Sequence, residues 1–533
     1  MPKNWIWWKH GTIYHIYVRS FFDANGDGIG DLGGIIKKMG YLKKLGIDAI
    51  WLSPVFSSPN IDYGYDVTDF MQINPEYGFI NEFKNLLDLA HRNGIRVILD
   101  MIMNHTSNNH PWFMESQESK ENPKRDWYIW KNPDKGKVPN NWRNCFGGSA
   151  WEYHSKTKQF YYHSFFREQP DLNWRNTDLK NEFLKIFKFW LDMGVDGFRL
   201  DVVNFIIKDK KFRNNPGFLR RFTFGQKLYT RNRPRSLKIL KEIRQLVDKY
   251  PEKMLVGEIY SLPPGNPVQA AKYLGNGKNM LHLTFDFSLI FQRWGARKYY
   301  LTLQSWYNAI PKKGWSCHVL SNHDLLRNYN RNRFRLFKKP KALVSAFFLL
   351  TIKGTPFIYY GDEIGMKNVF IPKRKMKDLL GIKYWPFFNG RDRARTPMQW
   401  NDEKNLGFSV STPWLPIRKN VSKNTVSMQL KSKRSILWYY RKLISIRKKT
   451  KALNFGDFQW IHTGESGYLI YQRSIEKDKI WIILNFRFAC IKLTNYNIKS
   501  QVLISTHRKS RSVIYLGQIK LLPFESTVVR VLK

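Results

Sequence analysis

Short apolar runs alternate with helical patterns along most of the chain, and this alternation restricts the fold more than any other feature. Runs typical of buried strands occupy residues 13–18, 49–52, 97–102, 197–200, 254–257, 281–285, 318–320 and 357–360. Helical patterns lie between them, at residues 33–45, 82–93, 181–193 and 237–250. Eight parallel strands that are each followed by a helix close into a barrel. The sequence therefore predicts an α/β protein built on a (β/α)8 TIM barrel.

Two segments depart from this alternation. The aromatic, Asn- and Gly-rich stretch 104–173 follows the third strand run and is far longer than an ordinary βα loop. From residue 454 on, short alternating runs at 468–472, 480–484, 502–505 and 527–531 are separated by turn residues, which is typical of antiparallel strands. The predicted domains are the catalytic barrel at 1–103 and 174–453, an inserted domain at 104–173 between the third strand and the third helix, and a C-terminal β-sandwich at 454–533.

Three carboxylates lie at the C-terminal ends of strand runs: Asp201, Glu258 and Asp324. In a parallel barrel these ends meet at one face, so the three acids are expected in one pocket. Cleavage of a glycosidic bond needs one ionised carboxylate beneath the anomeric carbon and a second, protonated one that donates to the leaving oxygen. Arg199 lies on the same strand face as Asp201 and is expected to keep it ionised, whereas burial is expected to keep Glu258 protonated. The pattern indicates carboxylate chemistry, of which glycosidic bond cleavage is one form.

Four motifs carry a family resemblance: residues 100–105 (DMIMNH), 197–204 (GFRLDVVN), 256–258 (VGE) and 321–324 (SNHD). They resemble the signature regions of glycoside hydrolase family 13, the alpha-amylase superfamily. The resemblance covers the chain from Trp5 onward, including the last domain. It implies that Asp201 is the nucleophile, Glu258 the general acid/base and Asp324 the stabiliser of the transition state. Family members retain anomeric configuration, which requires nucleophile and acid within roughly 5–5.5 Å.

Further motifs are similar to the alpha-glucosidase and oligo-1,6-glucosidase branch of that family. Residues 62–66 (DYGYD) follow the second strand run, and residues 391–400 (RDRARTPMQW) follow the eighth. In that branch the residues matching Asp62 and Arg391 clamp the terminal, non-reducing glucose, which makes the enzyme exo-acting. The other substrate-binding residues that the resemblance implies are Tyr65, His105, Phe146, Phe165, Gln169, Arg199 and His323.

A glycine-rich loop near the N-terminus presents oxygen ligands at alternate positions. They are Asp23, Asn25, Asp27, the carbonyl of Ile29, and Asp31. Hard cations prefer several oxygens on such a loop, and similar loops in this branch bind calcium or magnesium. We therefore predict a structural Ca²⁺, or Mg²⁺ in its place, and no cofactor for catalysis. The alternative is a loop of Asx turns without metal.

The charge of the chain is unusual for a sugar hydrolase. The sequence has 89 Lys and Arg against 42 Asp and Glu, a net charge of +47, which suggests nucleic acid or an anionic membrane as a partner. The basic residues are spread over all regions, and no known nucleic-acid-binding motif, signal peptide or membrane span is recognised. Compositional bias is therefore favoured over a functional basic surface, with an anionic sugar substrate as a third possibility. We predict a cytoplasmic monomer that binds a small oligosaccharide or disaccharide, and neither specific nucleic acid nor membrane.

Linkage preference depends on the residues just after the nucleophile. Val202 is the residue common in family members that cleave α-1,6 bonds, and an amide at Asn204 could hydrogen-bond the next sugar. Residues 207–216 and 256–260 instead resemble maltase-type enzymes. The predicted function is an exo-acting, retaining α-glucosidase for α-1,4 and/or α-1,6 bonds, with a modest preference for α-1,6. Alternatives are a trehalose-6-phosphate hydrolase, a sucrose isomerase or transglucosylase, and a catalytically silent relative of the transporter-ancillary type.

Overall fold

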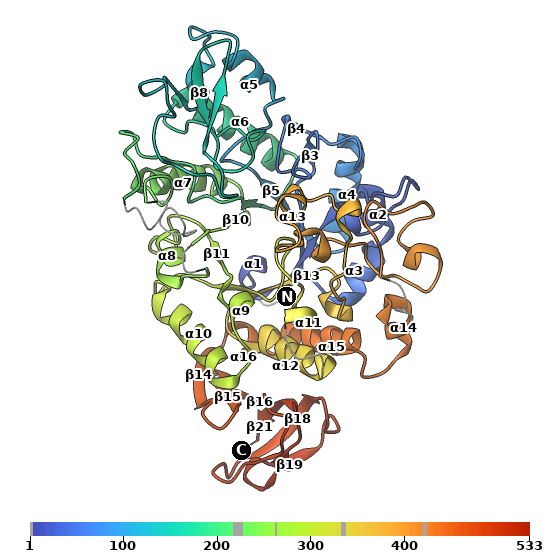
Figure 1. Cartoon of the computed structure of the whole chain (residues 1–533). Helices are drawn as coiled ribbons and strands as arrows, with labels where there is room; N and C mark the ends of the chain where they lie inside the picture. Colours follow the sequence, from blue (N-terminus) through green and yellow to red (C-terminus); the bar gives the residue numbers. More distant parts are fainter. Residues whose placement is uncertain (1–3, 217–227, 262–263, 332–336, 419–423, 533) are drawn as a thin grey trace.

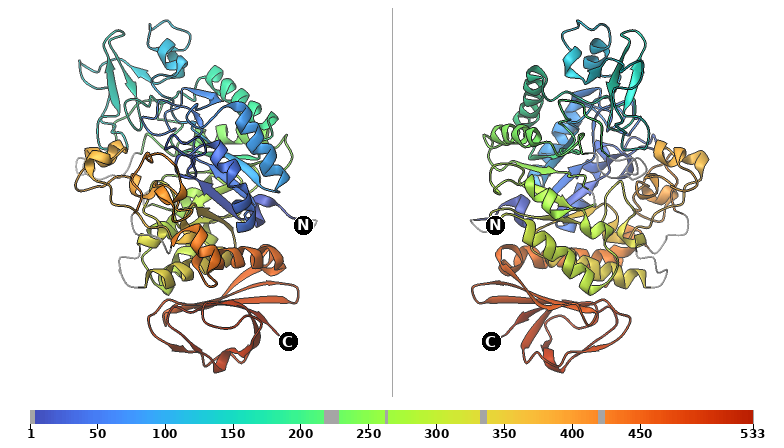
Figure 2. Two further views of the ribbon diagram at one scale, coloured as in Figure 1. Left: turned by 90° about the vertical axis from the view of Figure 1, so that its right-hand side faces the viewer. Right: turned by 60° about the vertical axis from the view of Figure 1, so that its left-hand side comes forward.

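Eight parallel strands close into a barrel in the computed structural model, which describes residues 4–216, 228–261, 264–331, 337–418 and 424–532 (Figures 1 and 2). The strands are β1 (Ile13–Ile16), β2 (Ala49–Leu52), β5 (Arg96–Met101), β9 (Gly197–Leu200), β10 (Met254–Gly257), β11 (Leu283–Asp286), β12 (Cys317–Val319) and β13 (Thr355–Tyr359). Their order around the barrel is β1-β13-β12-β11-β10-β9-β5-β2. The predicted (β/α)8 barrel is confirmed.

Two apolar layers stabilise the barrel. Side chains such as Ile13, Trp51 and Val256 form a core cluster of their own, whereas their strand neighbours Tyr14 and Leu52 belong to the larger cluster shared with the helices. This alternation follows from the period of two in a strand, which points successive side chains to opposite faces. Burying each large apolar side chain stabilises the fold by about 1.5–3 kcal/mol. Strands buried on both faces explain why the strand runs are apolar without interruption.

Helices cover the outside of the barrel. They include α2 (Leu32–Lys37), α3 (Met39–Leu45), α4 (Ile80–Arg92), α6 (Thr177–Asp192), α7 (Pro234–Val247), α10 (Ala296–Ala309), α12 (Lys338–Thr351) and α15 (Ile436–Lys449). In α6 the Asn176 side chain caps the first turn by accepting the N–H of Leu179, and Phe183, Phe187 and Trp190 form the buried face. None of the helices in the described ranges is both long and apolar enough to cross a membrane.

The segment between β5 and α6 forms a small domain of its own. It contains α5 (Pro111–Ser116) and a three-stranded sheet in the order β6-β8-β7, made of Trp130–Lys131, Gln159–Tyr162 and Trp151–His154. The carbonyl of Phe146 in this segment accepts hydrogen bonds from the hydroxyl of Tyr384 and from Lys383, at the end of α13 (Leu379–Lys383). This segment therefore lies between the third barrel strand and its helix, and it contacts the loop around α13.

The C-terminal part is antiparallel, as predicted. A six-stranded sheet runs β14-β15-β16-β21-β18-β19, with bounds Asp457–Thr463, Tyr468–Ile475, Asp478–Asn485, Ser526–Val531, Lys499–Ser505 and Val513–Tyr515. One face packs on barrel helices, where the hydroxyl of Tyr471 lies 2.6 Å from that of Thr351 at the end of α12. The other face carries apolar residues together with the two-stranded sheet β17 (Ile491–Lys492) and β20 (Lys520–Leu521). This domain lies at the opposite end of the molecule from the insertion (Figure 1).

Candidate active site

A pocket of about 190 Å³ lies where the C-terminal ends of the barrel strands meet the insertion and α13. Its lining residues are Asp62, Tyr65, His105, Cys145, Phe146, Phe165, Asp201, Val202, Glu258, Tyr260, Asp324, Leu380 and Arg391. A pocket of this volume has room for a small molecule. All three predicted catalytic acids line it. Gln169, Arg199 and His323 are buried beside it and contact its lining residues.

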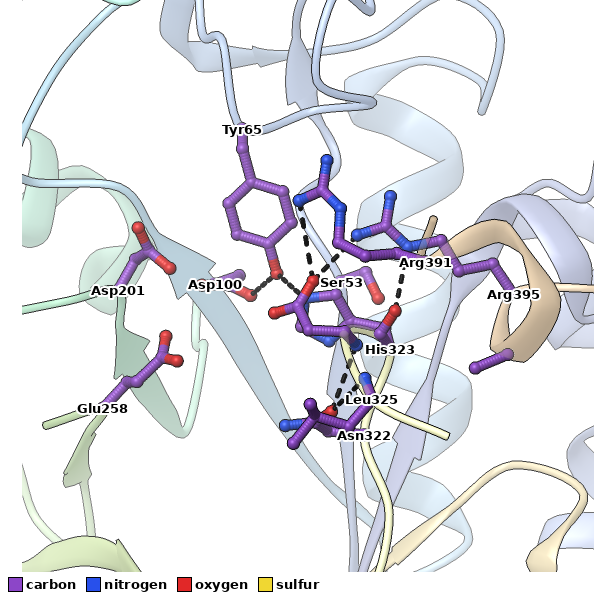
Figure 3. A network of polar contacts seen from close by, with 12 residues as sticks. Ser53, Tyr65, Asp100, Asp201, Glu258, Asn322, His323, Leu325, Arg391 and Arg395 are labelled. Atoms are coloured by element: carbon purple, nitrogen blue, oxygen red, sulfur yellow. Dashed lines mark hydrogen bonds and ion pairs between the residues drawn. The ribbon is translucent and has the colours of Figure 1, made fainter. Parts of the chain in front are cut away.

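One guanidinium group binds three carboxylates at the base of this pocket. Arg199 lies 2.6 Å from Asp100 and 2.7 Å from Asp201, and it also contacts Glu258. The register of the barrel produces this cluster, because Asp100 in β5 pairs with Arg199 in β9. Asp201 and Glu258 directly follow the neighbouring strands β9 and β10, and their side chains lie beside each other in Figure 3. Two carboxyl groups bound to one guanidinium lie close to each other, and a retaining mechanism needs its two carboxyl groups close together.

Burial and charge separate the proton affinities of the three acids. Burial raises the pKa of Glu258 to about 8 and that of Asp201 to about 7, in each case against the attraction of Arg199. The sequence predicted that Arg199 keeps Asp201 ionised; in the structure burial outweighs it, because the guanidinium serves three carboxylates. Burial alone would also raise the pKa of Asp324, but the charges of His323, Arg395 and Arg391 hold that pKa well below the usual range. Glu258 therefore retains its proton to the highest pH of the three.

Two arginines and a histidine position Asp324. Arg395 donates from Nη2 to its carboxylate at 2.8 Å and from Nε to the carbonyl of His323 at 2.9 Å. The Nε2 atom of His323 lies 2.7 Å from the hydroxyl of Tyr65, which also donates to Asp100 at 3.1 Å (Figure 3). Burial lowers the pKa of His323 to about 3, so the imidazole is neutral at physiological pH. This network connects the pocket wall to the Arg199 cluster.

An ion pair between Asp62 and Arg391 also lines the pocket. Arg391 donates from Nη2 to Asp62 at 2.7 Å and to Asp378 at 2.8 Å. Asp378 also accepts from the backbone N–H of Arg391 at 2.7 Å, so the guanidinium has little freedom to move. Gln169 supports Asp62 with a longer hydrogen bond of 3.4 Å. These fixed charged groups suit the hydroxyls of a sugar.

Aromatic rings from the insertion form another wall. The ring of Phe165 lies 5.2 Å from that of His105 and 5.7 Å from that of Phe146, measured between centroids. The imidazole of His105 contacts the carbonyl of Tyr65 at 2.9 Å. The structure therefore brings the aromatic residues named from the sequence to the same pocket as the acids.

The two residues considered for linkage preference occupy different environments. Val202 lines the pocket and has φ +35°, a rare conformation for a β-branched residue. Asn204 is fully buried, and its side chain accepts the N–H of Tyr260 at 3.1 Å and donates to the carbonyl of Tyr260 at 2.8 Å. The expectation that its amide meets the next sugar is wrong, because both ends of the amide are used to fix the chain after Glu258.

In the glycine-rich loop, carboxylates accept backbone hydrogen bonds. Asp23 accepts from Gly26 at 2.7 Å and Gly28 at 2.8 Å, and Asp31 caps α2. The two oxygens of Asp23 each keep a further lone pair that a hard cation could use, whereas the Oδ2 atom of Asp31 already accepts the N–H groups of Ala24 at 3.0 Å and Asn25 at 3.3 Å. Within the described ranges no three His, Cys, Asp or Glu side chains converge as a metal-ligand group. Two of the predicted ligands, the amide of Asn25 and the carbonyl of Ile29, are not of these four side-chain types. The metal therefore stays a prediction.

A family model described as "Alpha amylase, catalytic domain" matches residues 15–456. The chain belongs to the alpha-amylase family. It is 37% identical to an oligo-1,6-glucosidase of Parageobacillus thermoglucosidasius over 99% of both chains. It is 38% identical to a probable alpha-glucosidase of Rhizobium meliloti (strain 1021), over 90% of this chain and 89% of the relative. The trehalulose synthase MutB from Pseudomonas mesoacidophila MX-45 has a similar structure, with a TM-score of 0.90, 33% identity and 99% of both chains covered.

Sequence reasoning missed several pocket residues of this alpha-amylase family member. Arg395, which supports Asp324, gave a usable signal because it belongs to the motif that begins at Arg391, whereas Asp378, which supports Arg391, lies 13 residues before that motif and gave none. Cys145 and Tyr260, in irregular segments, and Leu380, in the short helix α13, also line the pocket, but none of them was named from the sequence as a site residue. Only the folded chain shows that these segments meet.

Proposed function

We propose that this chain is an exo-acting, retaining α-glucosidase for short oligosaccharides or disaccharides, acting on α-1,4 and/or α-1,6 bonds with a modest preference for α-1,6. The observation that supports it is the pair Asp201 and Glu258 on one guanidinium, in a pocket that the ion pair of Asp62 and Arg391 also lines. The full-length similarity to an oligo-1,6-glucosidase adds support.

The proposed reaction has two steps. The carboxylate of Asp201 attacks the anomeric carbon while Glu258 gives its proton to the leaving oxygen, which yields a glucosyl ester and a free alcohol. Glu258 then takes a proton from water, and the resulting attack on the anomeric carbon releases glucose and restores Asp201. Asp324 stays ionised and binds ring hydroxyls. Its negative charge stabilises the positive charge that develops on the sugar ring in the transition state. Asp62 and Arg391 bind the terminal glucose.

Product analysis tests this proposal and its alternatives. The chain is incubated with maltose, isomaltose, sucrose, trehalose and trehalose 6-phosphate, and the products are separated. Release of free glucose as the α-anomer supports the proposal. Sucrose isomers as the main product would show an isomerase; the similar MutB structure is that of a trehalulose synthase. No product from any substrate would show the catalytically silent relative. Calcium binding, the cytoplasmic location and the monomeric state stay predictions from the sequence.

A further inference from the structure

An arginine without an ion pair lies beside the pocket. Arg231 is only 6% exposed, and its guanidinium stacks on the rings of Phe205 and Tyr260 at 5.9 and 5.8 Å. No carboxylate of the described residues pairs with it, and the segments outside the described ranges contain no Asp or Glu. A buried charge is costly unless it is paired. The described residues therefore provide no counter-ion for Arg231, and an anionic ligand can provide one.

The neighbouring acid is already occupied. Asp209 binds Arg213 at 2.8 Å and Arg233 at 3.2 Å, and the N–H of Asp209 donates to the carbonyl of Tyr229 close to Arg231 in the chain. Two arginines thus share one carboxylate, and Arg231 is a third cation in the same stretch of the chain as Arg233. Arginine stays protonated in proteins, so this region carries excess positive charge.

Arg231 lies next to a residue on the side of the pocket where we expect the leaving group. Tyr260, on which it stacks, lines the pocket and is two residues beyond Glu258, the group that protonates the leaving oxygen in the proposed reaction. The glucose end of the pocket is formed instead by Asp62 and Arg391. The leaving group therefore departs on the side of Tyr260.

We propose that Arg231 binds an oxyanion on the leaving group, so that the preferred substrates are α-glucosides of acidic sugars, with a phosphate ester as the favoured substituent. This inference rests on the proposed glucosidase function and narrows its substrate class. A planar guanidinium suits phosphate because it can donate two parallel hydrogen bonds. The net charge of +47 would also attract such a substrate from solution.

Trehalose and trehalose 6-phosphate form a matched test, because they differ only in the phosphate. We expect kcat/KM of the wild type to be at least about tenfold higher for the phosphorylated sugar, which corresponds to about 1.4 kcal/mol. Arg231→Met should lower this ratio about tenfold, and Arg231→Lys should retain part of it. Arg213→Met is the control, because it removes a nearby cation that already has a carboxylate partner; it should leave the ratio unchanged.

A second readout separates this inference from the proposed function. In Glu258→Gln protein, calorimetry should give tighter binding of trehalose 6-phosphate than of trehalose, and Arg231→Met should remove the difference. Equal kcat/KM for the two sugars in a wild type that hydrolyses isomaltose well would overturn the role of Arg231 and leave the glucosidase standing. Turnover of none of the α-glucosides would overturn the proposed function, and the binding difference would still decide the role of Arg231.

Discussion

At the scale of single residues, the protonation of the catalytic acids depends on one buried cation that three carboxylates share. Arg199 contacts Asp100, Asp201 and Glu258 at once, so no carboxylate receives its full charge. Burial therefore sets the direction of the pKa shifts of Asp201 and Glu258. Asp324 instead contacts Arg395 and Arg391, and these two charges help to lower its pKa.

These shifts predict the pH dependence of the reaction. Glu258 must be protonated and Asp201 ionised, so kcat/KM should fall as pH rises through about 8 and as it falls through about 7. Because the two groups interact, the two limbs belong to the pair. Glu258→Gln, assayed by the initial burst from 4-nitrophenyl α-glucoside, should lose the alkaline limb and keep the acid limb. Persistence of the alkaline limb would assign it to another group.

Val202 should influence linkage preference, because its branched side chain narrows the pocket next to Asp201. A difference of one or two methyl contacts changes discrimination by about 1–3 kcal/mol. We expect wild-type kcat/KM to favour isomaltose modestly over maltose, and Val202→Ala to shift the ratio toward maltose by about tenfold. A wild type that clearly prefers maltose, with a ratio unaltered by the substitution, would disprove this role.

At the scale of elements, loops and strands contribute differently. The barrel strands fix Asp201 and Glu258, whose backbone N–H groups continue the strand pairing to Met101 and Leu200 at 3.0 Å. The loops supply the walls, as the contact between Phe146 and Tyr384 shows. Sites on regular elements are held more precisely than sites on loops. This agrees with the positions of the catalytic acids at the strand ends and of the predicted substrate contacts on several loops, including the insertion.

The glycine-rich loop gives a prediction at this scale. If it binds calcium in the folded state only, millimolar calcium should raise the melting temperature, since a ligand present at 100 times its Kd adds about 2.7 kcal/mol. Asp27→Ala should abolish the rise, because Asp27 is exposed and its carboxylate is one of the predicted ligands. The control is Asp134→Ala, an exposed acid of a different loop. Identical melting curves with calcium and with chelator would show that the loop binds no calcium.

At the scale of the whole molecule, the net charge of +47 opposes compactness through repulsion among the basic side chains. Added salt screens this repulsion, since the Debye length falls from about 10 Å at 0.1 M to 3 Å at 1 M. We therefore expect the melting temperature to rise between 0.05 and 0.5 M sodium chloride, by roughly 2 °C for each kcal/mol gained. Sucrose at equal osmolality is the control. An unchanged or lower melting temperature in salt would show that the charges do not destabilise the fold.

The sequence by itself determined the barrel, the insertion and the positions of the three acids, because these depend on local patterns. An apolar run that ends in Asp201 or Glu258 predicts both a strand and the face where its acid lies. Motif letters such as those around Arg391 are also local and could be compared directly.

Only the tertiary structure decided how these groups behave. The pKa of Asp201 depends on burial and on carboxylates from other strands, which are far away in the sequence. Asn204 lost its expected contact with sugar because Tyr260, 56 residues later, uses its amide. Among the described residues no carboxylate pairs with Arg231, although the acid Asp209 in the same part of the sequence binds both Arg213 and Arg233. Proton affinity and hydrogen-bond partners are set by neighbours in space, and a local sequence pattern does not contain them.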